Sequence, residues 1–196
     1  MGEEEKLVNC PKCKSVSLLD GTLAGNLAVK HCTECKGTWI PSAEYEAWQA
    51  QQPELKPVDP ESIAQILNVD FVQSPFDTKA ALCPGCGRYL SRAKVRLKTP
   101  FYVERCLNCS GIWCDHGEWE VLSQLGLHTT IEQLFSSEWQ IKVEKQQQSE
   151  KEREATMEKL GPELAARVFE LAEQLAKHPN GDFGVAYLMR QVGVTK

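Results

Sequence analysis

Between residues 92 and 98 the chain alternates basic and apolar side chains without a break, as Arg-Ala-Lys-Val-Arg-Leu-Lys. Successive side chains of a strand point to opposite faces, so this segment predicts a strand with one apolar and one basic face. Thr99-Pro100 turns the chain, and Phe101-Tyr102-Val103 returns as a second strand. The pattern therefore predicts a β-hairpin that leads towards Cys106.

The last third of the chain has a helical pattern. Thr129 followed by Glu132 is typical of a capping box and predicts the start of a long charged helix over 129–160. Its apolar stripe ends near Val143, and the remainder consists mainly of Lys, Gln and Glu. We expect that remainder to be an exposed helical arm or loosely ordered.

A second helical pattern follows Gly161-Pro162, where proline favours the first turn of a new helix. Apolar residues then recur at 4-3-4 spacing and form a candidate docking helix: Leu164, Val168, Leu171 and Leu175. A turn at Pro179-Asn180-Gly181 precedes a predicted final short helix. Residues 161–196 are thus expected to form an amphipathic helical hairpin, or to dock on a partner or a second copy.

Residues 50–80 carry several prolines and predict a linker with a short helix. Asp59-Pro60-Glu61 resembles a helix start, and Ile63, Ile66 and Leu67 would form a small apolar face.

Eight of the nine cysteines fall into four Cys-x-x-Cys pairs. The pairs are Cys10/Cys13, Cys32/Cys35, Cys83/Cys86 and Cys106/Cys109. A Cys-x-x-Cys turn directs two sulfurs at one metal, and two such turns joined by a hairpin supply four thiolates in a tetrahedron. The spacing therefore predicts two metal sites, each holding one Zn²⁺. Rubredoxin-type iron sites use the same ligands, so iron remains an alternative.

The two metal-binding segments are copies of one unit. An offset of 74 residues carries Cys32 to Cys106, Gly37 to Gly111 and Trp39 to Trp113. Agreement beyond the cysteines indicates an internal repeat. Each tryptophan follows its Cys-x-x-Cys turn closely, where a large ring can cover the metal site.

Each copy consists of Cys-x-x-Cys, a spacer, Cys-x-x-Cys-x-Gly-x-Trp and an acidic-aromatic segment. This pattern resembles the bacterial zinc-ribbon family named for transcription factor IIB. The family's usual ending is approximately G-G-x-W-L-D-x-G-E-L-E. The second copy, G-I-W-C-D-H-G-E-W-E at 111–120, follows it, whereas the first, G-T-W-I-P-S-A-E-Y-E at 37–46, has Pro41 where the second has Asp115. The resemblance covers roughly 8–49 and 81–125 and implies zinc and a ribbon fold; it does not imply a role in transcription.

We therefore predict a small metal-bound α+β fold: two zinc ribbons, each a β-hairpin plus a short helix, followed by an α-helical C-terminal tail. The ribbons are placed at 8–49 and 81–126. Ser42 is expected to cap a helix that runs to about Gln49, and Asp115 with Glu118 a helix from His116 to about Leu125. Cys114, the ninth cysteine, takes the place of Ile40 and is expected to be a small buried hydrophobe, with ligand exchange or redox chemistry as the alternative.

Composition places the chain among soluble proteins. Its 196 residues have a net charge of −5 and no apolar run near the roughly 20 residues that span a bilayer. The acidic N-terminus has no apolar stretch behind it and does not look like a secretory signal. Together with reduced cysteines, this predicts a cytoplasmic protein.

These features favour a non-enzymatic zinc-binding adaptor that docks on a protein partner or assembly. A four-cysteine site leaves no open position for substrate, and no catalytic motif is present. The first alternative is a nucleic-acid or RNA-polymerase-associated factor that binds through a basic surface on the second ribbon. The residues of this surface are Arg92, Lys94, Arg96, Lys98 and Tyr102. The second alternative is a thiol-redox or chaperone-like zinc protein.

Overall fold

The computed structural model describes residues 8–14, 16–53, 58 and 71–193, so the predicted linker helix near Asp59 lies outside the described residues. The chain divides into two compact units, Met1–Gln146 and Gln147–Lys196. Each is described by itself.

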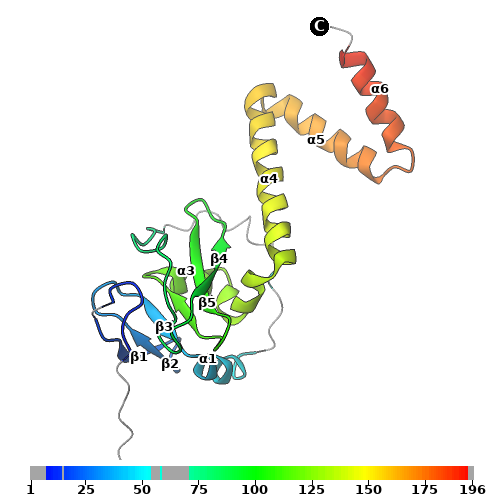
Figure 1. Cartoon of the computed structure of the whole chain (residues 1–196). Coiled ribbons are helices and arrows are strands. Elements are labelled where there is room, and N and C mark those ends of the chain that lie inside the picture. Colours follow the sequence, from blue (N-terminus) through cyan, green and yellow to red (C-terminus); the bar gives the residue numbers. More distant parts are fainter. Residues whose placement is uncertain (1–7, 15, 54–57, 59–70, 194–196) are drawn as a thin grey trace, which may run out of the picture. The chain divides into compact units, whose positions relative to one another are not determined.

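A six-stranded antiparallel sheet joins both ribbons in the first unit (Figure 1). The first ribbon contributes β1 (Leu19–Leu23), β2 (Leu27–His31) and β3 (Thr38–Ile40). The second contributes β4 (Leu90–Val95), β5 (Phe101–Cys106) and β6 (Ile112–Cys114). The strand order is β1-β2-β3-β6-β5-β4, so the third strands of the two ribbons lie at the centre. The small metal-bound α+β fold is confirmed, and the ribbons share one sheet.

The central strand pair has a two-fold register. Trp39 lies opposite Trp113, and Ile40 lies opposite Ile112. Each ribbon also has the predicted hairpin, β1 with β2 and β4 with β5. β4 ends at Val95, so the last residues of the alternating segment lie beyond the strand.

One helix follows each third strand. α1 (Ser42–Gln49) starts after Pro41, which is its N-cap, while the Ser42 hydroxyl donates to Glu46 Oε1 over 2.6 Å. Pro41 has no side-chain acceptor, so the helix has no side-chain cap, and Ser42 is the first helical residue. The prediction for Ser42 was therefore wrong by one position.

The second ribbon's helix, α3 (Glu118–Gln124), is shorter than predicted and starts after Gly117, whose φ is 82°. Half of the predicted capping box forms, because the Asp115 N–H donates to Glu118 Oε2 over 2.7 Å. The Asp115 carboxylate instead accepts the Trp113 indole N–H over 2.7 Å. That bond draws the carboxylate away from the helix, which accounts for the later start.

Residues after α3 complete the core of the first unit. Two 3₁₀ turns, Leu127–Thr129 and Ile131–Phe135, precede α4 (Ser137–Leu160). The predicted helix over 129–160 thus begins eight residues later, at Ser137. Tyr45 explains this difference, since its hydroxyl donates to His128 O over 2.9 Å and accepts from Ile131 N over 3.3 Å. This bonding holds the chain in turns while Ile131 enters the core.

The second unit contains the rest of α4, α5 (Pro162–Lys177) and α6 (Gly181–Gly193). Pro162 is the first residue of α5, as the sequence indicates. α5 and α6 meet closely at their turn, because a Cβ on Gly181 would lie 1.8 Å from the Leu175 carbonyl oxygen. No helix in the described part of the chain is long and apolar enough to cross a membrane.

Candidate metal centres

The first metal centre consists of Cys10, Cys13, Cys32 and Cys35, whose sulfurs all lie within 4.8 Å of one another. Individual sulfur–sulfur distances are 3.6 Å between Cys10 and Cys35 and 3.9 Å between Cys13 and Cys32. A tetrahedron with Zn–S bonds of about 2.3 Å has sulfur–sulfur edges of about 3.8 Å. The cysteines therefore fit one Zn²⁺.

The second centre has the same construction, with Cys83, Cys86, Cys106 and Cys109 within 4.8 Å of one another. Its sulfur pairs Cys83/Cys109 and Cys86/Cys106 are each 3.4 Å apart. Cys86 is exposed, whereas the other three ligands are buried or half-buried. The two tetracysteine sites fit two zinc ions, and both are closed structural sites.

All four Cys-x-x-Cys turns have the same backbone geometry. In each, the first cysteine's carbonyl accepts the N–H of the residue after the second cysteine, over 2.8 to 3.1 Å. That following residue has a positive φ in every case: Lys14, Lys36, Gly87 and Ser110. A left-handed residue reverses the chain just after the second sulfur, so the hairpin can continue while both sulfurs face the metal.

One thiol in each site is favoured as the thiolate, which is the form that binds metal. The hydrogen bond with Cys35 lowers the pKa of Cys10 to about 5. In the second site the Arg88 N–H lowers the pKa of Cys86 to about 7. Burial raises the pKa of Cys13, Cys83 and Cys109, and the hydrogen bond with Cys10 raises that of Cys35. Cys114 is 1% exposed, and burial raises the pKa of its thiol well above the usual value.

Each tryptophan lies against the other ribbon. A Cβ on Gly111 would lie 2.2 Å from the ring of Trp39, and a Cβ on Gly37 would lie 2.3 Å from the ring of Trp113. Both rings belong to one buried cluster that also contains cysteines of both sites. The sequence suggests that each ring covers the metal site of its own ribbon. In the structure the pairing of β3 with β6 places each ring against the other ribbon instead.

A buried ion pair, which sequence reasoning missed, also connects the ribbons. Lys12, inside the first Cys-x-x-Cys turn, places its Nζ 2.5 Å from Glu104 Oε1 and 3.8 Å from Asp115 Oδ2. The same ammonium donates to the carbonyls of Phe76 and Lys79 over 3.2 and 3.0 Å. One signal was available, because Glu104 is the lone acid in an otherwise basic stretch of the second ribbon.

Three buried carboxylates, Asp77, Asp115 and Glu118, lie within 4.8 Å of one another beside this ion pair. Tyr102 N–H and Gln73 Nε2 donate to Asp77 over 2.7 and 2.6 Å. Burial, with the charge of Asp115, raises the pKa of Glu118 well above its usual value. A proton on Glu118 thus relieves the repulsion among these carboxylates.

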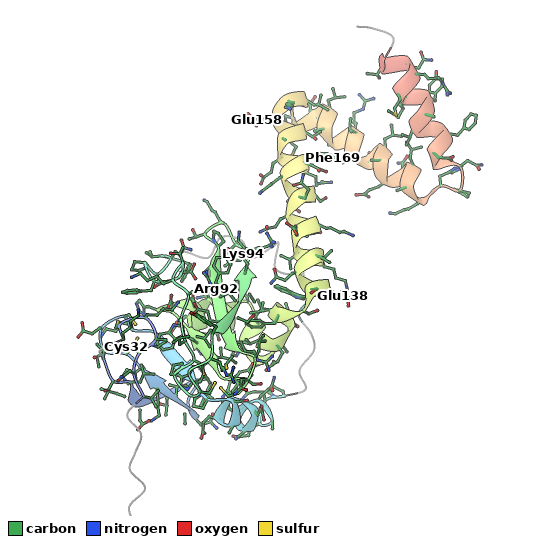
Figure 2. The ribbon with its side chains drawn as sticks, in the orientation of Figure 1. Cys32, Arg92, Lys94, Glu138, Glu158 and Phe169 are labelled. Carbon is green, nitrogen blue, oxygen red and sulfur yellow. The ribbon has the colours of Figure 1, made fainter. Side chains whose placement is uncertain are left out.

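The predicted basic surface is partly occupied by contacts within the ribbon. The Arg92 guanidinium lies 4.0 Å from the centre of the Tyr102 ring, and it donates to the Asp77 carbonyl. Arg96 pairs with Glu144 over 3.5 Å. Lys94 is half-buried and Lys98 is exposed. Figure 2 labels Arg92 and Lys94 on β4.

The candidate docking helix is α5. Leu164, Val168 and Leu171 are exposed on it, and Leu175 is half-buried near the turn to α6. A Cβ on Gly184 would lie 2.5 Å from Leu175 Cδ2, so α6 covers this end of α5. Within the described residues of the second unit, Leu164, Val168 and Leu171 are therefore left exposed, whereas α6 covers Leu175 at the turn.

Residues 9–51 match the family of transcription factor zinc-finger domains, the zinc ribbon of the TFIIB type. The matched segment is the first ribbon, whose ending departs further from the family pattern than that of the second. No curated protein and no solved structure gives a significant match to the chain. The chain thus contains a zinc ribbon of the transcription-factor-IIB type at residues 9–51, and its second tetracysteine cluster is consistent with a tandem copy of that unit.

Proposed function

We propose that this protein is a non-enzymatic zinc-binding adaptor that docks on a protein partner through the second ribbon and the helical tail. The observation that carries the proposal is the apolar surface of α5 and α6. The closed metal sites support it as well, because four sulfurs leave no position for substrate or activated water. We place the adaptor in the cytoplasm, where thiols stay reduced.

The tail exposes more apolar surface than a helical hairpin needs for its own packing. Phe183, Met189 and Val192 on α6 are 75, 71 and 74% exposed. Single exposed apolar residues are ordinary, but a set on two neighbouring helices marks an interaction site. An amphipathic helix with anchors at i, i+4, i+7 and i+11 is suited to a groove on another protein.

The second ribbon offers a second apolar surface, around its metal site. Tyr89 and Leu107 are 77 and 79% exposed, and Leu82 pairs with Tyr89 in an isolated bridge. The matching positions of the first ribbon hold Asn9, Ser17 and Thr33. This difference supports the second ribbon as the binding module and the first as the scaffold.

The alternatives have less support. Arg92 and Arg96 are held by partners within the chain, so a phosphate backbone would have to compete with those contacts. A redox function at Cys114 is disfavoured because its thiol is buried and its raised pKa keeps it protonated.

Partner capture by the full chain tests the proposal. Leu164→Glu with Leu171→Glu places two negative charges on the apolar face of α5, and Ala166→Glu places one negative charge on an exposed position outside that series. We expect captured proteins, identified by cross-linking and mass spectrometry, to be lost with the leucine variant and retained with the alanine variant.

A nucleic-acid function would give a different result. Capture of RNA or DNA that weakens steeply with salt, and that Lys94→Glu with Lys98→Glu removes, would replace the adaptor proposal. Protein capture that neither the α5 variant nor Tyr89→Asp with Leu107→Asp reduces would also contradict it.

A further inference from the structure

We propose that the two zinc sites are energetically coupled, and that Trp39 and Trp113 are the positioning residues that couple them by each completing the opposite ribbon's site. This inference concerns metal binding and is independent of the adaptor function. It rests on the exchanged tryptophans, the shared sheet and the buried Lys12 ion pair.

Trp39 reaches the second site from the first ribbon. Its ring faces Gly111, and a Cβ on Gly85 would lie 3.3 Å from the ring. That same Gly85 position is 3.7 and 3.8 Å from the sulfurs of Cys83 and Cys109. The Trp39 ring therefore packs on both Cys-x-x-Cys segments that hold the second metal, and is itself 4% exposed.

Trp113 has the position related to that of Trp39 by the two-fold register. Its ring faces Gly37 of the first ribbon, and it is 0% exposed. Its indole N–H donates to Asp115 Oδ1, and the other oxygen of Asp115 faces Lys12 of the first Cys-x-x-Cys turn. Each ribbon thus supplies one ring and one glycine, and Lys12 with Asp115 adds an ionic contact.

Neither glycine is required by backbone conformation, since Gly37 and Gly111 lack the positive φ that favours glycine. They are required by the rings, which leave no room for a methyl group. The carbonyl of Gly37 accepts the Cys32 N–H, and that of Gly111 accepts the Cys106 N–H, over 2.9 Å in each case. The surface that receives each ring is therefore part of the metal-binding turn itself.

Coupling follows from how small zinc domains fold. A ribbon has too little core to fold by itself, so metal binding and folding occur together. The ring of one ribbon is buried only when the other ribbon's turn has folded on its metal. Zinc at either site thus stabilises the surface that the other needs, and by linkage the effect is reciprocal. Removing a residue that supports ligands typically costs about 10- to 100-fold in metal affinity.

The test uses the full chain loaded with Cd²⁺, whose NMR resonances distinguish the two sites once a Cys86→Ser variant has identified the second. Addition of Zn²⁺ displaces Cd²⁺, and the decay of each resonance gives the release rate at that site. In Gly111→Ala, which displaces Trp39, we expect release from the first site as well as the second to accelerate about 10- to 100-fold. Gly37→Ala should act likewise on the second site.

Gly193→Ala is the matched control, because nothing lies within 4 Å of a Cβ there, and both rates should stay unchanged. If each glycine variant accelerates release only from its own ribbon's site, the inference is wrong. If a glycine variant fails to fold, Trp39→Phe and Trp113→Phe give the same comparison with a smaller change. Each should then accelerate release from the opposite site, and an effect confined to its own site would overturn the inference.

Discussion

Replacement of Lys12 by methionine tests the buried ion pair that links the ribbons. Methionine keeps the length of the side chain and removes the charge. The Lys12 side chain is 0% exposed and its ammonium contacts Glu104, Asp115 and two carbonyls. Removing one partner of a buried ion pair leaves the other charge uncompensated and costs about 3 to 5 kcal/mol.

That loss corresponds to a fall in Tm of roughly 6 to 20 °C for a protein of this size. Thermal and denaturant unfolding with zinc in excess would measure it. Lys14→Met is the control, because Lys14 belongs to the same turn and is exposed. The double variant Lys12→Met with Glu104→Gln should recover much of the loss, because it removes the uncompensated charge.

The loss should also depend on pH. Burial raises the pKa of Glu104 to about 7 even with Lys12 present, and removal of Lys12 raises it further. At pH values between the usual pKa of a glutamate and the raised one, Glu104 is protonated in the native state and ionised in the unfolded state. Stability therefore falls as pH rises through that range. The variant should therefore lose less at about pH 6 than at about pH 8. A loss equal to that of Lys14→Met, or no recovery in the double variant, would refute the reasoning.

Three further predictions follow from single positions. Glu118→Gln should raise the free energy of unfolding at about pH 8 by roughly 1 to 3 kcal/mol and flatten its pH dependence, because a neutral amide replaces a buried carboxylate whose pKa is raised. Denaturant titrations at two pH values would measure this, and a lower free energy of unfolding at both would contradict it. Cys114→Ser should cost about 1 to 3 kcal/mol and Cys114→Ala less, while elemental analysis still finds two zinc ions per chain; a lower zinc content would make this cysteine a ligand. Gly181→Ala should open the turn between α5 and α6, since its Cβ would meet the Leu175 carbonyl, whereas Gly193→Ala should not. Hydrogen exchange over the two helices would distinguish the variants, and equal protection in both would contradict the expectation.

The metal ligands were predictable because the spacing of Cys-x-x-Cys pairs is a local signal with a chemical meaning. The start of α5 was predictable for the same reason, since proline after glycine at 161–162 acts locally. The joining of the two ribbons was not predictable. β3 and β6 have three residues each, too few for an alternating pattern to show, and they lie far apart in the chain.

Contacts between distant residues explain the other differences. Lys12 and Glu104 are 92 positions apart, and a lone acid in a basic stretch does not indicate which distant cation pairs with it. The Thr129 and Glu132 pattern favours a helix start, yet Tyr45 bonds the backbone on either side of this segment and holds it in 3₁₀ turns. The helix propensity of a segment is overridden where a buried side chain from another element hydrogen-bonds the backbone groups that the helix would use.

The central pairing of β3 with β6 also decides which strand edges remain open. A ribbon standing alone would present β3 as a free edge, which is a template for pairing with another chain. Because β3 pairs with β6 of the same chain, neither edge remains free to pair with another copy. Within the described sheet the open edges are β1, which has five residues, and β4, whose basic side chains discourage flat pairing. Two copies of one ribbon in a single chain thus place both β3 and β6 in the interior of one six-stranded sheet, where neither offers an edge to another chain.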